Sequence, residues 1–293
     1  MKFRNNQDRL GATAPDDGAG AAIAAQSQES ESKSNGSAFN FTTPTEFVDL
    51  PSKGKLYPKE HYLHGIESVE IKYMTAKDED ILTSRTLLKK GIAIDRFLQN
   101  IVIDKKINVD DLFVGDKNAL IVAARVTGYG SEYTTRVVCP SCANNSEYSF
   151  DLTSAKYNYG DNLEDFDATL TENQTFSVTL PHSTVQVEVR LMTGRDEKKL
   201  SKISESKKKH RLADSSLTDQ FRLIMVSVNG NAERSVIESF VQHMPARDSR
   251  YLRTVYAKIM PNVDLTQEFM CDMCEYDGEM EVPFTADFFW PKR

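Results

Sequence analysis

The sequence predicts an α+β protein made of two related halves of strands and helices, packed about a pseudo-twofold axis. Two observations carry this prediction. Residues 69–82 recur as residues 187–200, and two Cys-x-x-Cys pairs stand 132 positions apart. A composition of 40% apolar and 27% charged residues is typical of a globular chain. The fold class therefore rests on an internal repeat.

Residues 1–44 are rich in Gly, Ala, Ser, Gln and Asn and contain few large apolar side chains. Such a segment cannot bury enough apolar surface to offset the entropy lost on ordering. We expect a disordered N-terminal tail over residues 1–44. Ordered structure should begin near Phe47, where two prolines and a glycine follow within residues 50–58.

The fourteen-residue repeat is identical at seven positions. Each copy begins with alternating apolar and charged residues, which is the pattern of a half-buried strand. A threonine then precedes an aspartate by three residues, as Thr75 and Asp78 in one copy and Thr193 and Asp196 in the other. This spacing resembles a capping box and also suits the positive end of a helix dipole. Each copy therefore predicts a strand, a cap and a helix.

Aligning the cysteine pairs extends the repeat to the rest of each half. Asp116 and Asp248 both stand 23 residues before the first cysteine of their pair, and both are expected at helix starts. Helices are expected over residues 119–126 and 251–259, followed by strands over 133–138 and 265–270. The 14 extra residues of the second copy are expected to form a polar loop around residues 204–219.

The four cysteines are Cys139, Cys142, Cys271 and Cys274. Strand-like segments over residues 147–152 and 279–284 follow the pairs, so each pair is expected at the turn of a hairpin, as a zinc knuckle. Four thiolates satisfy a tetrahedral zinc ion and leave no position open for water or substrate. We expect one structural zinc ion per chain in a zinc-ribbon-like site. The predicted divisions are then 45–155 and 156–293, each a repeat half with its own knuckle.

Other interpretations of the cysteines remain. The pairs are much farther apart than in a compact ribbon finger. An intermolecular site, with one pair from each of two chains, would also explain this separation. Iron would suit the same four thiolates, and a redox-active pair or cysteines that bind nothing are the remaining alternatives.

Global features bear on location. The first ten residues lack the apolar core of a secretory signal, and the longest apolar run, residues 119–124, is too short to cross a bilayer. We expect a protein of a reducing cytoplasm with no membrane partner. In that compartment paired cysteines indicate a metal site more often than a disulfide.

Sequence motifs of common enzymes are absent. The sequence has no phosphate-binding loop, dinucleotide fingerprint or nucleophile elbow, and none of its five histidines has the spacing of a zinc peptidase. We therefore expect a non-enzymatic protein with no catalytic residue.

The main alternative function is a zinc-ribbon protein that binds nucleic acid or modulates transcription. It would need a basic surface, for which Arg125, Arg136 and residues 207–211 are the candidates. The net charge of −7 argues against it. The aromatic end, with Phe284, Phe288, Phe289 and Trp290, is expected to be the last edge of the second half and to pack into the fold. An exposed docking tail is the alternative.

Four stretches carry a resemblance to a known family: residues 50–58 (LPSKGKLYP), 74–82 (MTAKDEDIL), 128–133 (GYGSEY) and 139–142 (CPSC). Together they resemble the baseplate hub proteins of T4-like contractile-tailed bacteriophages. The resemblance implies a structural or assembly protein of the tail baseplate hub, whose partners are other phage tail or hub proteins. It also implies a location in the bacterial host cytoplasm during assembly, and in the virion tail baseplate if the protein stays in the finished particle.

Overall fold

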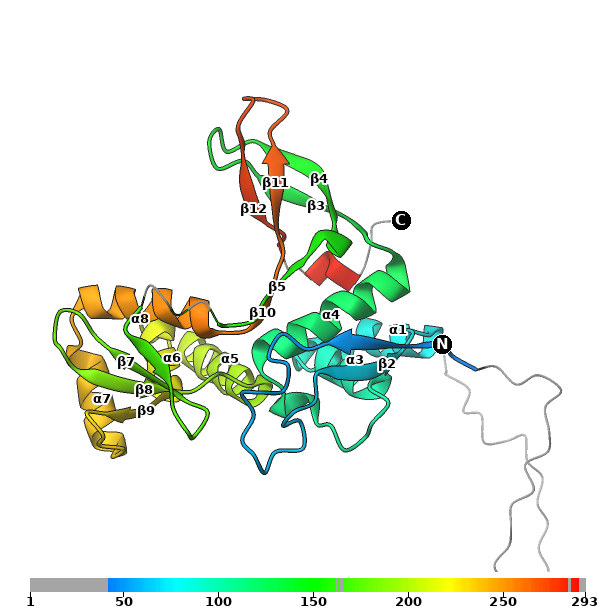
Figure 1. The fold of residues 1–293 in the computed structure, drawn as a ribbon. Coiled ribbons are helices and arrows are strands. Elements are labelled where there is room, and N and C mark those ends of the chain that lie inside the picture. The colour runs from blue at the N-terminus through cyan, green and yellow to red at the C-terminus, as the bar shows by residue number, and fades with distance from the viewer. Residues whose placement is uncertain (1–41, 162, 164–165, 284–285, 290–293) are drawn as a thin grey trace, which may run out of the picture. The chain divides into compact units, whose positions relative to one another are not determined.

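The structure is a computed structural model that describes residues 42–161, 163, 166–283 and 286–289 (Figure 1). Residues 43–293 form one compact unit. The predicted tail over residues 1–44 therefore falls almost wholly outside the described residues. Its last two residues, Thr43 and Pro44, belong to the compact unit, and the Pro44 carbonyl accepts the backbone N–H of Tyr73 at 2.9 Å.

The first half of the described chain is a two-stranded antiparallel sheet with helices beside it. The sheet pairs β1 (Thr45–Asp49) with β2 (Ser68–Lys72). The helical elements that follow are α1 (Ala76–Thr83), α2 (Arg85–Lys89), α3 (Ala93–Ile101), a 3₁₀ turn (Val109–Asp111) and α4 (Val114–Tyr129). Helix α4 is the longest of these and lies against β1. It also leads into the hairpin that carries Cys139 and Cys142.

The second half contains a four-stranded antiparallel sheet in the order β6-β7-β8-β9. Its strands are β6 (Ala168–Leu170), β7 (Phe176–Thr179), β8 (Gln186–Val189) and β9 (Met225–Val228). Its helices are α5 (Gly194–Lys209), α6 (Ser216–Ile224), α7 (Arg234–His243) and α8 (Ala246–Ile259). The α+β content predicted from the sequence is confirmed.

The predicted unit of strand, cap and helix occurs at both copies of the repeat. At α1 the backbone N–H and the hydroxyl of Thr75 both donate to Asp78, at 3.0 and 2.6 Å, and Lys72 of β2 pairs with the same carboxylate. The matching residues at α5 are Thr193, Asp196 and Arg190. Each carboxylate is buried and caps the helix start, so neither is available as a catalytic acid.

The aspartates expected at helix starts also occupy matching positions. Asp116 is the third residue of α4 and accepts the backbone N–H of Ser52 at 2.9 Å. Asp248 is the third residue of α8 and accepts the backbone N–H of His182, also at 2.9 Å. Both donors follow a Leu-Pro pair at the end of a strand, at residues 50–51 and 180–181. Each aspartate therefore ties a helix start to the end of a strand distant in sequence.

The polar loop expected around residues 204–219 was wrong. Helix α5 continues to Lys209, and α6 begins at Ser216, so the extra residues mainly lengthen helices. Lysine and glutamate have good helix propensity, and three lysines in the last turn of α5 suit the negative end of its dipole. Lys207 contacts Asp219 of α6 rather than standing free in a loop.

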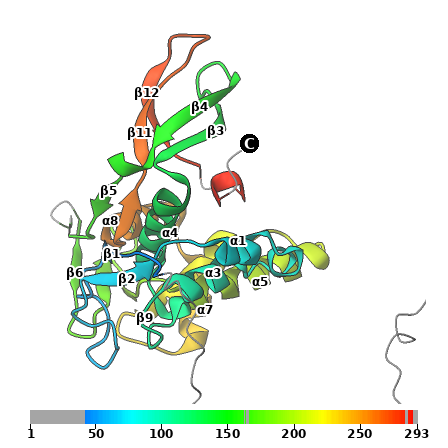
Figure 2. The ribbon, with the colours of Figure 1, turned by 90° about the vertical axis from the view of Figure 1, so that its right-hand side faces the viewer.

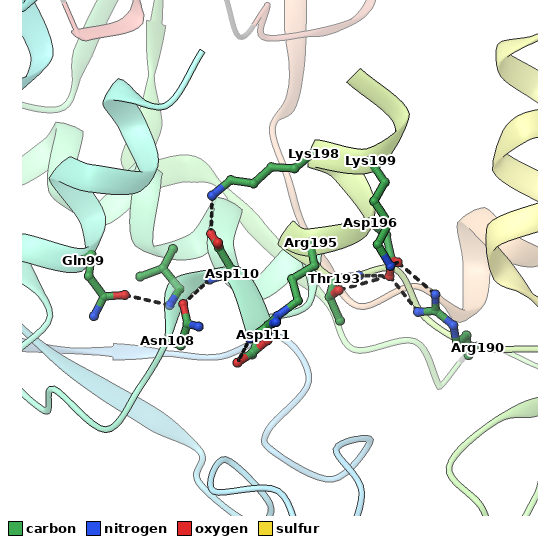
Figure 3. Close-up of polar contacts among 11 residues, drawn as sticks. Gln99, Asn108, Asp110, Asp111, Arg190, Thr193, Arg195, Asp196, Lys198 and Lys199 are labelled. Carbon is green, nitrogen blue, oxygen red and sulfur yellow. Dashed lines mark hydrogen bonds and ion pairs between the residues drawn. The ribbon is translucent and has the colours of Figure 1, made fainter. Parts of the chain in front are cut away.

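The two halves meet at the start of α5, which abuts the 3₁₀ turn (Figure 3). The backbone N–H of Gly194 donates to Leu112 at 2.9 Å, and the backbone of Asp110 lies 3.3 Å from where a Cβ on Gly194 would stand. Arg195 pairs with Asp111, and Lys198 pairs with Asp110. A side chain at residue 194 would therefore be in tight contact with the backbone of the 3₁₀ turn.

Three antiparallel strand pairs complete the fold and position the cysteines. Hairpin β3–β4 joins Glu132–Val138 to Asn145–Asp151, and hairpin β11–β12 joins Thr266–Met270 to Asp277–Glu281. Below them β5 (Lys156–Asn158) pairs with β10 (Asn262–Asp264). Figures 1 and 2 both show the two hairpins side by side.

No helix within the described ranges is both long and apolar enough to span a bilayer.

Candidate metal centre

The four cysteines occupy the turns of the two hairpins, as the sequence predicts. Cys139 follows β3 and Cys142 precedes β4. The backbone N–H of Cys139 donates to Asn144 at 2.9 Å, and its carbonyl accepts the N–H of Ala143 at 3.0 Å. The residue after Cys142, Ala143, has φ 57°, in the left-handed region. These features define a tight knuckle.

The second knuckle has the same construction. The backbone N–H of Cys271 donates to Tyr276 at 2.8 Å, and its carbonyl accepts the N–H of Glu275 at 3.2 Å. Glu275 follows Cys274 and has φ 55°. Residues 139–144 and 271–276 differ in sequence at most of their positions but adopt the same backbone path. In both, the two thiols of the pair lie on one side of the turn.

The sulfur atoms of all four cysteines lie within 4.8 Å of one another. Cys139 Sγ stands 3.7 Å from Cys274 Sγ, and Cys142 Sγ stands 3.8 Å from Cys271 Sγ. A tetrahedron with metal–sulfur bonds of about 2.3 Å has sulfur–sulfur edges of about 3.8 Å, whereas a disulfide bond is about 2.05 Å long. The donor set and its spacing therefore fit one metal ion held within a single chain.

The hairpins below the cysteines are held together by an aromatic core. The ring of Tyr148 on β4 contacts that of Phe269 on β11, with centroids 5.0 Å apart and an edge-on arrangement. Tyr148 also contacts Phe150, and Phe269 contacts Tyr276. Edge-to-face packing of this kind favours one relative orientation of the two hairpins. This packing places the turns of the two hairpins, with their sulfur atoms, next to each other.

Each pair contributes one buried and one exposed cysteine. Cys139 and Cys271 are buried, whereas Cys142 and Cys274 are exposed. Burial raises the pKa of the Cys139 thiol, but the backbone N–H groups of Cys142 and Ser141 outweigh it and lower the pKa to about 7. The N–H of Asn144 lowers the pKa of Cys142, yet its thiol neighbours raise it to about 12. The Cys139 thiolate therefore forms readily, whereas the Cys142 thiol keeps its proton, so a cation must displace that proton when it binds.

The chemistry of the site is that of a closed cage. All four candidate ligands are thiols, and among the described residues no histidine or carboxylate joins them in the cluster. A catalytic metal usually keeps a position for water and has nitrogen or oxygen ligands. The arrangement can hold a metal ion that braces two hairpins.

The basic residues named for a nucleic-acid interface do not form one open surface. Arg125 is 1% exposed and donates to the backbone carbonyls of Gly130, Glu132 and Phe288. Arg136 pairs with Glu147 at 3.6 Å on the outer face of β3–β4. Arg125, at least, is unavailable to a phosphate group, because its donors face carbonyls inside the fold.

The aromatic residues Phe288 and Phe289 pack inside the fold, and their ring partners belong to the first half. Phe288 contacts Tyr133 and Phe289 contacts Phe97, with ring centroids 5.1 and 5.3 Å apart. Both phenylalanines are 2% exposed, so packing is confirmed for these two and a free docking tail is wrong for them. Phe284 and Trp290 lie outside the described residues. The long-range partners on β3 and α3 have no signal in the sequence.

Comparison with known proteins supports the resemblance seen in the sequence motifs. A family model described as T4 bacteriophage base plate protein matches residues 43–290, which is most of the chain. No curated protein and no solved structure matches. A match of this extent indicates a structural protein of the phage baseplate. The chain therefore belongs to the T4 bacteriophage base plate protein family.

Proposed function

We propose that this protein is a structural or assembly component of the baseplate hub of a contractile phage tail, and that one structural zinc ion braces its scaffold. The observation that carries the proposal is the convergence of Cys139, Cys142, Cys271 and Cys274 from two hairpins far apart in sequence. A chain so braced is suited to binding other proteins in a fixed geometry.

Zinc is the metal that this donor set favours. Zinc has no geometric preference from its d electrons, and a closed set of four cysteines is its usual structural site. Iron would accept the same thiolates, so metal analysis must distinguish the two. Since the ligands come from both hairpins, binding energy of the ion contributes directly to holding the hairpins together.

The braced units are two related halves, residues 45–155 and 156–293. The supporting features are the matched capping boxes, the aspartates at the third positions of α4 and α8, and the two knuckles of equal backbone path. A duplication explains why the cysteine pairs are so widely separated in sequence. Each pair is the knuckle of its own half, and the ion would lie near the axis that relates them.

A hub role implies other tail or hub proteins as partners, and assembly in the cytoplasm of the infected host. Such a role needs rigid surfaces rather than catalysis, in agreement with a closed cage at the cysteines. The acidic net charge of −7 also favours protein partners over nucleic acid.

The experiment is recovery of the tagged full-length protein from infected cells, with mass spectrometry of its partners and of purified particles. Recovery of tail or hub proteins is expected, and presence in the particle separates a structural part from an assembly factor. Recovery of RNA polymerase, or of nucleic acid that is released by salt, would instead support the zinc-ribbon alternative.

A further inference from the structure

One edge of strand β1 is open in the described structure. Hydrogen bonds from Tyr73 N–H to Pro44 and from Leu50 N–H to Glu67 fix which β1 residues bond to β2. By the alternation of an antiparallel pair, every second residue of β1 turns its backbone groups the other way. The outward groups belong to Thr45, Phe47 and Asp49, and no described strand pairs with them.

The second half shows what a covered edge looks like. Strand β7 is the counterpart of β1 in the second half. It pairs with β8 as β1 pairs with β2, and a Leu-Pro dipeptide follows both strands. On its other edge β7 also pairs with β6, in the register Ala168↔Val178 to Leu170↔Phe176. The position corresponding to β6 is thus vacant beside β1 in the described residues.

A hollow of about 340 Å³ lies at this open edge. Four consecutive residues of β1, Glu46 to Asp49, line it, as expected of a strand edge rather than a strand face. Helix α4 provides one wall, which is mostly small and apolar, and a second wall comes from residues in and near β5 and β10, namely Leu152, Thr153, Ala155, Tyr157 and Val263. The residues of the α4 wall include Ala119, Val122, Ala123 and Val126.

Helix α4 differs from the corresponding helix α8 in the size of one side chain that faces this space. Ala119 and Tyr251 each stand three residues after the buried aspartate of their helix. The hydroxyl of Tyr251 accepts the backbone N–H of Asp167 at 3.1 Å, and its ring contacts Phe166, so it holds the segment that leads into β6. Ala119 presents only a methyl group, and the hollow occupies the corresponding space.

The hollow also contains an unsatisfied hydrogen-bond acceptor. One carboxylate oxygen of Glu46, Oε1, is buried and has no hydrogen-bond partner in the described structure. Burial raises the pKa of this carboxyl group. Buried acceptors are normally paired, so an unpaired carboxylate oxygen in a hollow favours a cationic donor from elsewhere.

We propose that this slot accepts an extended segment of a partner protein as an added strand on β1, with a lysine or arginine of that segment beside Glu46. Strand addition gains affinity from main-chain hydrogen bonds and specificity from alternate side chains. The proposal rests on the protein-binding role proposed above, but it concerns a surface separate from the cysteines. Phe47, which is 70% exposed on β1, would provide an apolar contact on the outer side.

The test uses the full chain and two synthetic peptides, Ac-TVKVTV-NH₂ and its counterpart with glutamate in place of lysine. Amide hydrogen exchange should slow at Thr45, Phe47 and Asp49 when the lysine peptide binds, and the glutamate peptide should bind more weakly. Glu46→Gln should remove this preference for lysine, while leaving the exchange of distant amides unchanged.

Phe47→Pro removes one outward N–H, and proline is tolerated where an edge strand's N–H faces away from its partner. Its affinity for the lysine peptide should fall about two- to tenfold, the worth of one main-chain hydrogen bond. Phe47→Ala retains the N–H and serves as the matched control, so its loss should be smaller. Circular dichroism should show both variants folded.

Three results would overturn the proposal. They are protection that appears away from β1, equal binding by wild type and Phe47→Pro, and a dimer that forms through β1 without peptide, which would make a second copy the occupant. None of these results depends on recovery of tail proteins from infected cells. A failure here is therefore distinct from a failure of the hub proposal.

Discussion

The buried guanidinium of Arg125 on α4 donates from Nε to the backbone carbonyl of Phe288 at 2.7 Å, and no carboxylate pairs with it in the described structure. Its other nitrogens bond the carbonyls of Gly130 and Glu132. A single side chain therefore joins the end of α4, the start of β3 and the C-terminal 3₁₀ turn (Ala286–Phe289). The charge is satisfied by three backbone dipoles.

Replacement of Arg125 by methionine should destabilise the protein by about 2–4 kcal/mol, because it removes the side-chain donor of three carbonyls, one of them in a buried contact and two in part-buried ones. Urea unfolding followed by circular dichroism measures this loss. Arg136→Met is the matched control, since Arg136 is exposed and its ion pair contributes little. Equal losses in the two variants would contradict the role assigned to Arg125.

Cys139→Ser and Cys271→Ser should each abolish stoichiometric metal binding and lower the stability of the whole chain, because assembly of the site is coupled to folding. Metal analysis of wild-type protein purified under reducing conditions should return one zinc ion per chain. Met273→Ala is the control within a knuckle, because Met273 is 72% exposed and offers no thiol. A wild-type protein that is free of metal but fully stable would refute the proposed structural zinc site.

Asp248→Asn should cost about 1–3 kcal/mol at pH 7, because an amide nitrogen would replace an oxygen that accepts a backbone N–H. Burial raises the pKa of Asp248, but hydrogen bonds from Ser183 and His182 outweigh it and lower the pKa below its usual value. The stability it confers is therefore present above about pH 4 and is lost as pH falls through its folded pKa. Urea unfolding at pH 7 and pH 3 measures both effects.

Asp116→Asn should behave oppositely. Burial raises the pKa of Asp116 despite donors from Ser52 and Tyr57. A raised carboxyl pKa means that ionisation costs stability as pH rises through the folded value. An asparagine could accept the Ser52 N–H and donate to a hydroxyl, so we expect no loss, or a gain, at neutral pH in the same urea titrations. A loss as large as that of Asp248→Asn would be inconsistent with this assignment.

Gly115→Ala should be strongly destabilising, because its Cβ would lie 1.8 Å from the carbonyl oxygen of Pro261. Backbone cannot yield as a side chain can, so α4 and β10 would have to separate. Gly128→Ala in the same helix meets only the flexible end of Met74, and it gains up to about 1 kcal/mol of helix propensity. The midpoint of thermal unfolding should therefore be lower for Gly115→Ala and close to that of wild type for Gly128→Ala.

Local pattern predicted much of the fold. The repeat located β2 and β8 and the caps at Thr75 and Thr193, because capping and strand alternation depend on neighbouring residues. The cysteine spacing placed both knuckles for the same reason. It also suggested which thiols belong together, although the spacing alone left a site between two chains open.

The features that the sequence did not reveal depend on residues far apart in the chain. The pairing of β5 with β10 and the contact of Arg125 with Phe288 have no local signature. The polar composition of residues 204–219 suits an exposed loop and an exposed helix equally, because lysine and glutamate are good helix formers. Composition alone therefore does not predict the length of α5. The open edge of β1 became visible only by comparison with β7.

The unequal exposure of the cysteines sets the order in which the clamp would come apart. A chelator or oxidant in solution first reaches Cys142 and Cys274, one thiol from each hairpin, while Cys139 and Cys271 remain covered. If the ion is lost, oxidation of the two outer thiols would link the same hairpins covalently. Ageing in air would then replace the metal site by a disulfide bond between the same two hairpins. A non-reducing peptide map would show the Cys142 and Cys274 peptides joined.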